Sequence, residues 1–131
     1  MNKKEVLVTG GTQGIGEAIV HTLMAETDYN VHITYRSSSA KADELCKQYD
    51  GRLFAHKLDQ GSPETIMSAS FLSEHDWYGV VFNAALGSAT VKQYAAQDGD
   101  VLGSKNDLAM LTVNALGPLW IYRMIQKKLE E

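Results

Sequence analysis

One stretch near the amino terminus, VLVTGGTQGIGEAIV at residues 6–20, constrains the fold of this 131-residue chain more than any other. A short β-branched run comes first, four glycines follow within seven positions, and apolar residues at helical spacing come last. This order predicts a strand over residues 5–9, a glycine-rich turn and a helix. Such a turn brings backbone N–H groups to the positive end of the helix dipole, which suits a phosphate group. The alternative interpretation is a tight turn without a ligand.

The rest of the chain alternates between strand and helix patterns. Short apolar runs rich in β-branched and aromatic residues indicate three further strands. They are predicted at NVHITY (30–35), GRLFAHKLD (51–59) and WYGVVFNAA (77–85), the last centred on Val80, Val81 and Phe82.

Three more helices are predicted between and after these strands. The first, over residues 37–49, begins with a serine cluster that offers an N-cap. Ser62 is expected to cap the second, with Pro63 at its first position and Glu64 near the positive end of its dipole. A polar loop precedes the last helix, which extends from about residue 107 to residue 128. Its predicted apolar face comprises Leu108, Leu111, Ala115, Leu119, Tyr122 and Ile125.

Strands that alternate with helices predict right-handed βαβ crossovers and a parallel sheet covered on both faces. The expected fold class is therefore α/β, a Rossmann-type doubly wound sheet with four βα units and the strand order 3-2-1-4. We expect residues 1–131 to form a single nucleotide-binding domain, with its ligand at the carboxyl ends of the strands.

Composition limits the classes of partner and the compartment. Apolar residues make up 44% of the chain, which suits one soluble domain, and the twelve basic residues are scattered at a net charge of −4, so we expect no nucleic-acid partner. Cys46 is the only cysteine, cannot form an internal disulfide, and is expected to be a buried structural thiol in a reducing compartment. The apolar run before the first glycine is too short for a signal peptide, and no run of about 18 apolar residues exists. We therefore predict a cytoplasmic protein without membrane contact.

The four histidines, His21, His32, His56 and His75, are far apart in the sequence and fall in different strand and helix contexts. Zinc ligands commonly occur at short, regular spacings. We therefore predict no metal site.

The glycine turn is not a P-loop, because Glu17 stands where that motif needs a lysine. Its sequence TGGTQGIG, residues 9–16, resembles the TGxxxGxG turn of the short-chain dehydrogenase/reductase family, and the resemblance extends over nearly the whole chain. It implies that this turn binds the pyrophosphate of a dinucleotide and places Ile15 beside the nicotinamide. The cofactor-binding residues expected here are Gly10, Thr12, Gln13, Gly14, Ile15 and Gly16.

The end of the second strand, TYRSSS, indicates which dinucleotide is bound. An NAD site would place an acidic residue here to hold the ribose 2′-OH, and this segment has none. Arg36 can bind a 2′-phosphate in a bidentate manner next to Tyr35, and Ser37 adds a hydroxyl. The predicted cofactor is NADP(H), with an exposed loop arginine as the alternative. The missing acid also disfavours another Rossmann-like enzyme, such as a methyltransferase.

Two further segments match the family. Asp59 corresponds to the aspartate that accepts a hydrogen bond from the adenine amine, with an ordinary turn residue as the alternative. The segment FNAALG occupies the position of the family's NNAG motif, where Asn83 matches the first asparagine and Ala85 the alanine. It departs from the motif where Ala84 replaces the second asparagine and Leu86 the glycine. The resemblance places Asn83, Ala84 and Ala85 at the cofactor.

Asn114, in TVNALGPLW, matches the asparagine of the family's catalytic tetrad. Pro118 has no N–H and cannot donate to the Asn114 carbonyl four residues earlier, so a regular helix is disfavoured there. The resemblance implies that a water bound at this asparagine continues a proton relay to the catalytic lysine. A kinked packing helix is the alternative.

The serine, tyrosine and lysine of the tetrad are absent, because none of the six tyrosines is followed by a lysine four positions later. The resemblance therefore implies the N-terminal half of an NADP(H)-dependent oxidoreductase that acts on a small carbonyl or alcohol. These 131 residues alone are not expected to be catalytically competent. The alternative function is a catalytically inactive NADP-binding or redox-sensing module.

The expected strand order leaves the fourth strand at an open edge and the last helix without a neighbour. An unpaired hydrophobic edge favours association. We therefore expect a homo-oligomer.

Overall fold

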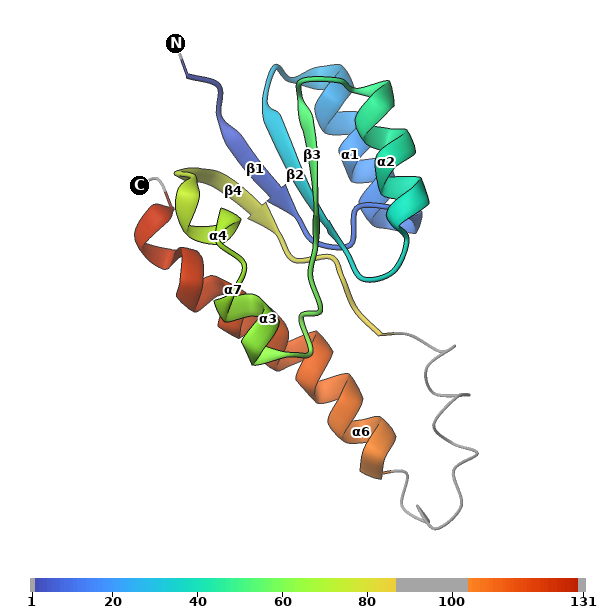
Figure 1. Cartoon of the computed structure of the whole chain (residues 1–131), viewed down its shortest axis with the longest axis vertical. Helices are drawn as coiled ribbons and strands as arrows, with labels where there is room; N and C mark the ends of the chain where they lie inside the picture. The colour runs from blue at the N-terminus through green and yellow to red at the C-terminus, as the bar shows by residue number, and fades with distance from the viewer. Residues whose placement is uncertain (1, 87–103, 130–131) are drawn as a thin grey trace.

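The computed structural model describes residues 2–86 and 104–129, and its four strands form one parallel sheet in the order β3-β2-β1-β4 (Figure 1). The strands are β1 (Glu5–Val8), β2 (Asn30–Tyr35), β3 (Leu53–Lys57) and β4 (Trp77–Val81). Val8 of β1 lies beside Ile33 of β2 on one side and Val81 of β4 on the other. The predicted fold class and strand order are confirmed.

Helices lie on both faces of the sheet (Figure 1). One face carries α1 (Gly14–Glu26) and α2 (Ser39–Gln48). The other carries α3 (Pro63–Met67), α4 (Phe71–Glu74) and α7 (Gly117–Ile125). A π-helical turn, Thr112–Leu116, joins α7 to α6 (Ser104–Leu111), and a 3-10 turn, Gln126–Lys128, follows α7.

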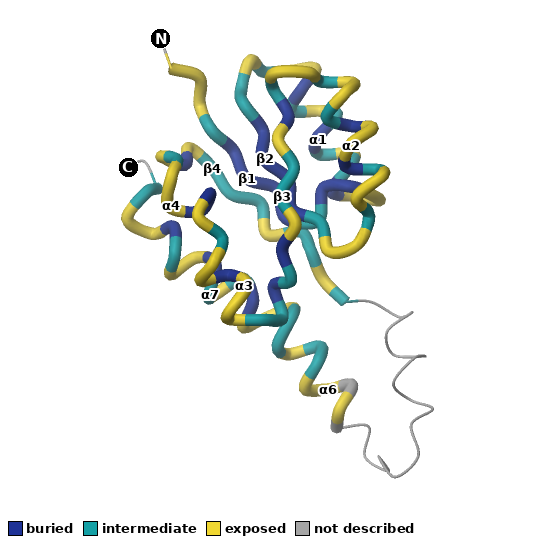
Figure 2. The backbone as a smooth tube through the Cα atoms, in the orientation of Figure 1, coloured by how far each residue is buried: buried dark blue, intermediate teal, exposed yellow. Residues whose placement is uncertain are grey.

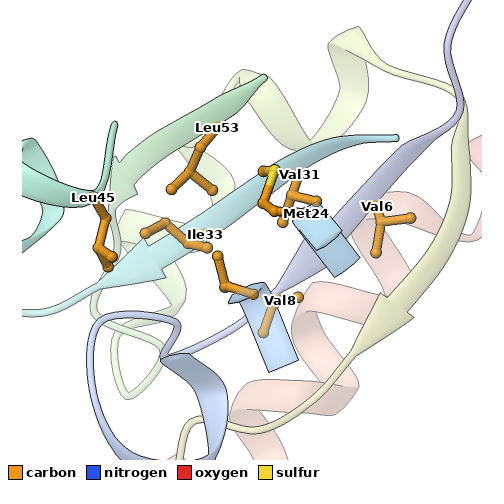
Figure 3. Packing of buried hydrophobic residues seen from close by; sticks show 8 residues of the cluster. Val6, Val8, Met24, Val31, Ile33, Leu45 and Leu53 are labelled. Carbon is orange, nitrogen blue, oxygen red and sulfur yellow. The ribbon is translucent and has the colours of Figure 1, made fainter. Parts of the chain in front are cut away.

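Each face of the sheet has its own apolar core, because successive side chains of a strand point to opposite faces. Val6 and Val8 point toward α1 and α2 (Figure 3), whereas Leu7 points toward α3, α4 and α7. The first cluster comprises Val6, Val8, Val20, Met24, Val31, Ile33, Leu45 and Leu53. The second comprises Leu7, Leu58, Ile66, Phe71, Leu72, Trp77, Ile121 and Ile125. Burial on both faces explains the continuous apolar runs of the strands.

The fourth strand is shorter than predicted, since it ends at Val81 and leaves Phe82 outside the ladder and exposed. The hydroxyl of Thr9 ends the pairing, because it accepts hydrogen bonds from the backbone N–H groups of Asn83 and Ala84 at 3.0 and 3.1 Å. These side-chain bonds replace the backbone partner that the next strand residue would have used.

The helix predicted to begin after Ser62 is divided into α3 and α4. Its start is confirmed, because Ser62 caps α3 by accepting from the N–H of Thr65, with Pro63 at the first position. The break falls at the Ser-Ala-Ser segment 68–70, whose serines form helix poorly and favour caps and turns. The serine cap of α2 is only partly confirmed: Ser38 occupies the N-cap position, but its side chain makes no capping hydrogen bond.

Cys46 is half-buried against the cluster beneath α2, so the thiol is less buried than predicted. Burial and the neighbouring Asp43 carboxylate raise the pKa of this thiol. A thiol with a raised pKa is a weak nucleophile, in keeping with a structural role.

The apolar face predicted for the last helix lies mostly in solvent (Figure 2). Leu108 is 64% exposed and Leu111 59%, and Leu119 and Tyr122 are also exposed. Ile125 belongs instead to the opposite, buried side, which it shares with Ile121. The prediction was wrong for Ile125, because this residue lies one helical turn after Ile121 and continues the buried side of α7. We call the four exposed residues Leu108, Leu111, Leu119 and Tyr122 the outer stripe.

By length and composition alone, the helical stretch Asp107–Lys128 would suffice to cross a membrane. One such helix is weak evidence, because the core helix of a soluble protein passes the same test. Ile121 and Ile125, which are fully buried against the sheet, place its second half in the core.

Candidate functional site

A cleft of about 540 Å³ opens at the carboxyl ends of the strands, where the fold class predicts the ligand. The loops that follow all four strands contribute to it. The predicted residues that line it are Gly10, Thr12, Gln13, Gly14, Ile15, Tyr35, Arg36, Ser37, Asp59, Asn83, Ala84 and Ala85. Further lining residues are Thr34, Ser38, Leu58, Gln60, Leu86 and Val113. Gly16 and Asn114 lie beside the cleft without lining it.

The glycine turn between β1 and α1 has a backbone that only glycine adopts easily. Gly10 and Gly14 have φ values of +69° and +57°. The N–H of Gly10 donates to both the carbonyl and the hydroxyl of Thr34, at 3.1 and 3.2 Å, which fixes the turn against β2. At Gly16 a Cβ would lie 2.1 Å from the Gly10 carbonyl oxygen. Gly16 therefore allows helix α1 to approach the turn, and its contact with a cofactor stays a prediction.

The amino end of α1 is directed at the cleft without a capping side chain. Gln13 occupies the N-cap position and makes no side-chain cap hydrogen bond. Glu17 in the first turn adds a negative charge, but Lys41 lies 2.9 Å from its carboxylate. The hydrogen bond from Lys41 lowers the pKa of Glu17. Because Lys41 offsets the charge of this carboxylate, the end of the helix remains suited to an anion.

Asn83 ties the end of β4 to the glycine turn. Its Nδ2 donates to the Gly10 carbonyl at 3.1 Å, and its backbone N–H donates to Thr9. A Cβ on Gly10 would lie 2.9 Å from the Cα of Ala84. The two backbones are thus packed too closely for a side chain at Gly10, and Asn83 acts on the turn as well as lining the cleft.

Arg36 and Asp59 lie on the loops that follow β2 and β3. Arg36 is exposed and lines the cleft together with Ser37. Asp59 lines it too, while its Oδ1 accepts a hydrogen bond from the Gly61 N–H at 2.9 Å. The turn role considered for Asp59 is therefore present in the structure, and its contact with an adenine amine stays a prediction.

Gln60 is a site residue that the sequence analysis missed. It is 6% exposed, and its Nε2 donates to the carbonyls of Ala84 and Val113 at 2.9 and 2.7 Å. In the π-helical turn the Gly117 N–H bonds to the Thr112 carbonyl, five residues back. The Val113 carbonyl then faces Pro118, which has no N–H, so Gln60 supplies the missing donor. A glutamine next to the predicted Asp59 was the only signal in the sequence.

The irregular helix predicted at Asn114 is present, but its register changes which carbonyl Pro118 leaves without a helical donor. The expectation named the Asn114 carbonyl, four residues back, whereas the five-residue register moves the effect to Val113. The Asn114 side chain bonds to the backbone of Leu86, accepting from its N–H at 2.7 Å and donating to its carbonyl at 3.1 Å. Asn114 thereby holds the loop after β4, and its catalytic role stays a prediction.

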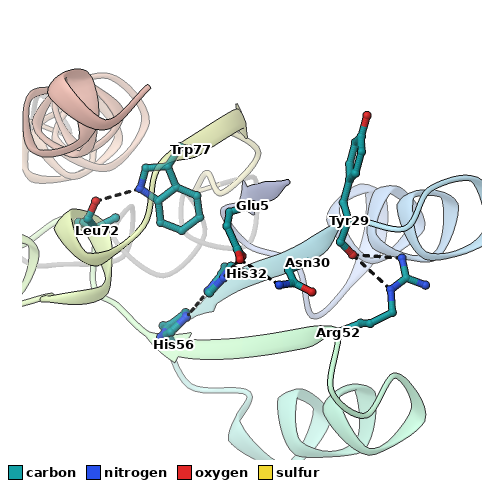
Figure 4. Close-up of polar contacts among 8 residues, drawn as sticks. All are labelled: Glu5, Tyr29, Asn30, His32, Arg52, His56, Leu72 and Trp77. Atoms are coloured by element: carbon teal, nitrogen blue, oxygen red, sulfur yellow. Dashed lines mark hydrogen bonds and ion pairs between the residues drawn. The ribbon is translucent and has the colours of Figure 1, made fainter. Parts of the chain in front are cut away.

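The expectation that the histidines are dispersed is wrong for three of them. His32 lies 2.9 Å from His56 between ring nitrogens (Figure 4). The rings of His32 and His75 have centroids 4.4 Å apart. Burial lowers the pKa of His32, and burial with the neighbouring His32 and His75 lowers that of His56 to about 4. The adjacent parallel strands β2 and β3 bring His32 and His56 together, and the segment after α4 brings His75 to them, although the three are distant in the sequence. The cluster lies apart from the cleft residues.

The amino-acid sequence of the chain matches one protein family over nearly its full length. The model of the short chain dehydrogenase family matches residues 4–131. The chain therefore belongs to the short-chain dehydrogenase family, as its glycine turn indicated. No sequence among the curated proteins matches it significantly.

Solved structures show the same fold and a difference in length. A short-chain dehydrogenase/reductase from Burkholderia multivorans with bound NADP is similar over 98% of this chain and 55% of its own, at 20% identity and a TM-score of 0.79. A short-chain alcohol dehydrogenase from the same organism has 21% identity and a TM-score of 0.78 over 98% of this chain and 57% of its own. The KRED1-Pglu enzyme has 27% identity and a TM-score of 0.77 over 96% and 51%. The chain thus spans about half the length of these relatives.

Proposed function

We propose that this chain is the NADP(H)-binding half of a short-chain dehydrogenase/reductase, which transfers hydride between the nicotinamide and a small carbonyl or alcohol. The observation that carries the proposal is the glycine turn, where Gly10 has a positive φ and Gly16 leaves no room for a Cβ. Main-chain N–H groups and the end of α1 therefore face the cleft, as a diphosphate requires. Ile15, 74% exposed at its rim, offers an apolar surface for the nicotinamide.

The cofactor would supply the hydride, while the chain's own residues position it. The proposed contacts follow the course of the cleft. Thr12 and Gln13 would lie at the pyrophosphate, Asn83 to Ala85 at the ribose next to the nicotinamide, and Asp59 at the adenine. Asn114 would bind the water that continues a proton relay to the catalytic lysine of the family. The similar Burkholderia multivorans structure contains NADP, which supports a nicotinamide cofactor here.

Arg36 is expected to select NADPH over NADH. In Arg36→Ala, the affinity for NADPH should fall by about 1.5–3 kcal/mol, because a charge-assisted hydrogen bond to the 2′-phosphate is lost. The affinity for NADH should change little, since NADH has no such phosphate. Isothermal titration with both dinucleotides measures the difference.

Lys47→Ala is the matched control for this titration, because it removes an exposed positive charge from the last turn of α2. It should leave both affinities unchanged. Equal affinity of the wild-type chain for NADPH and NADH would overturn the assignment of NADP(H), though not that of a dinucleotide site.

A catalytically inactive NADP-binding or redox-sensing module is the second candidate function. It would apply if the tyrosine and lysine that supply and activate the proton donor in the family were absent from the whole protein, as they are from these 131 residues. A hydride-transfer assay with NADPH and simple ketones tests the first candidate. Consumption of NADPH by this chain would contradict the inactive module, whereas binding without consumption is expected of both candidates, because this stretch lacks the tyrosine and lysine of the tetrad.

We also propose that the chain self-associates through the outer stripe or the β4 edge, and that it acts in the cytoplasm. β4 has only β1 as a neighbour among the described strands, and the outer stripe exposes large apolar side chains. Light scattering at high concentration should show a dimer or larger species, and Leu119→Glu should shift it toward the monomer. Met67→Glu, at an exposed apolar residue of α3 outside the stripe, should not. A stable wild-type monomer would contradict this proposal.

A further inference from the structure

Three side chains of the types that bind transition metals in proteins, a glutamate and two histidines, converge toward the amino end of the sheet, away from the cleft. Glu5 begins β1, His32 lies in β2, and His75 immediately follows α4, in the connection to β4. One ligand atom from each lies within 4.8 Å of the other two. We propose that Glu5, His32 and His75, which we call the basal triad, bind a divalent transition-metal ion such as Zn²⁺.

The ligand types fit such an ion. Two imidazoles and one carboxylate form a set that zinc and its neighbours in the first transition row prefer. The Oε2 of Glu5 already lies 2.8 Å from the Nε2 of His32. Tetrahedral bonds of about 2.0–2.2 Å would place neighbouring ligand atoms slightly further apart than this pair and closer than the 4.8 Å limit. Small side-chain shifts therefore suffice to surround one ion.

Partners behind the ligands hold two of them in position. Asn30 donates to the Oε1 of Glu5 at 2.9 Å, which turns Oε2 toward His32 (Figure 4). The Nδ1 of His32 lies 2.9 Å from the Nε2 of His56. An ion on Nε2 of His32 requires the proton of that ring on Nδ1, where His56 accepts it. Metal-binding histidines generally have such a partner on their second nitrogen.

The rings of the basal triad are also held by packing. His32 is only 3% exposed. The indole of Trp77 contacts the rings of both His32 and His75, with centroid distances of 5.1 and 5.3 Å, and its Nε1 is anchored to the Leu72 carbonyl at 2.9 Å. Trp77 restricts the rotation of both imidazoles, so little conformational freedom remains to be lost when an ion binds.

The other interpretation is a buried polar cluster in which Glu5 and His32 form an ordinary hydrogen-bonded pair. That pair alone does not account for His75, whose ring lies against His32 beside the same carboxylate. A cation between the three groups would give both imidazoles and the carboxylate a common partner. With three protein ligands, a fourth coordination position would be left for water.

Bound metal would act on the fold rather than on the proposed hydride transfer, because the basal triad shares no residue with the cleft. It would join β1, β2 and the segment before β4. An ion that binds only the folded chain raises the free energy of unfolding in proportion to the logarithm of its concentration above the dissociation constant.

The test is a titration of the metal-free 131-residue chain with Zn²⁺ by calorimetry, with thermal unfolding measured in parallel. We expect one ion per chain and a higher melting temperature. His75→Ala and Glu5→Gln should each weaken binding by about 10–100-fold or more. Both residues are only half-buried, so these variants are preferred to His32→Ala, which would disturb the core. Co²⁺ should give a visible absorption band that His75→Ala abolishes.

Two controls test whether the ion binds elsewhere. His21→Ala removes a half-buried histidine near Glu17, and Cys46→Ser removes the only thiol. Neither should change the affinity for Zn²⁺ or the stoichiometry. The proposal is overturned if the folded wild-type chain binds no stoichiometric Zn²⁺, or if Glu5→Gln and His75→Ala bind the ion as tightly as the wild type does. It is also overturned if either control variant loses as much affinity for Zn²⁺ as the variants of the basal triad do.

Discussion

Replacing Gly16 by alanine is expected to abolish NADPH binding and to lower the free energy of unfolding by about 2–4 kcal/mol, the combined effect of overpacking and a lost hydrogen bond. The added Cβ would lie 2.1 Å from the Gly10 carbonyl oxygen and 2.5 Å from the Nδ2 of Asn83. Neither atom moves easily, because Gly10 is bonded to Thr34 and Asn83 is bonded to Gly10. NADPH titration and urea denaturation followed by circular dichroism measure the two effects.

Gly79→Ala is the matched control, because it makes the same substitution in a strand where a Cβ meets nothing within 4 Å. Its φ is not positive, so alanine brings no backbone strain. We expect unchanged NADPH binding and stability within about 0.5 kcal/mol of the wild type. If Gly16→Ala binds NADPH as Gly79→Ala does, the glycine turn does not hold the diphosphate.

Removal of the Trp77 side chain should have the largest effect on stability, a loss of about 3–5 kcal/mol in Trp77→Ala. Trp77 is fully buried, and its indole contacts the rings of His32, His75 and Phe71. Alanine would leave a cavity and a Leu72 carbonyl without its donor. Urea denaturation followed by circular dichroism measures the loss, and Trp77→Phe, which retains a ring, should lose about 1–3 kcal/mol.

Trp120→Ala serves as the control, since Trp120 is only partly buried beside the same core. Its loss should be about 1–2 kcal/mol, in proportion to the smaller area buried. Because the chain has two tryptophans, this variant also leaves Trp77 as the sole indole reporter of unfolding. Equal losses in Trp77→Ala and Trp120→Ala would show that the second core does not depend on Trp77.

Features set by local sequence could be predicted. The turn around Gly10 and Gly14 needs positive φ values, which short-range sterics dictate, and the cleft follows once parallel strands end at one edge. The cap of α3 was equally readable, because a serine before a proline satisfies a helix start within four residues. These elements depend on neighbours along the chain.

Features that depend on contacts between distant parts of the chain could not be predicted from the sequence. His32, His56 and His75 meet only because strand pairing and α4 bring them together, and no spacing in the sequence encodes that. Gln60 gained its role from a helical register that propensity does not specify. The outer stripe was recognised as apolar, but its period could not show whether it faced the sheet or solvent.

The two hydrogen bonds of Gln60 have a mechanical consequence. Its side-chain nitrogen donates both to the loop after β4, at Ala84, and to the π-helical turn, at Val113, so a shift of one segment also moves the other. A partner that binds to the outer stripe and displaces the last helix will therefore also displace the lining of the cleft, through the side chain of Gln60. Ligand binding in the cleft and association through the last helix are thus coupled, and each should change the affinity of the other.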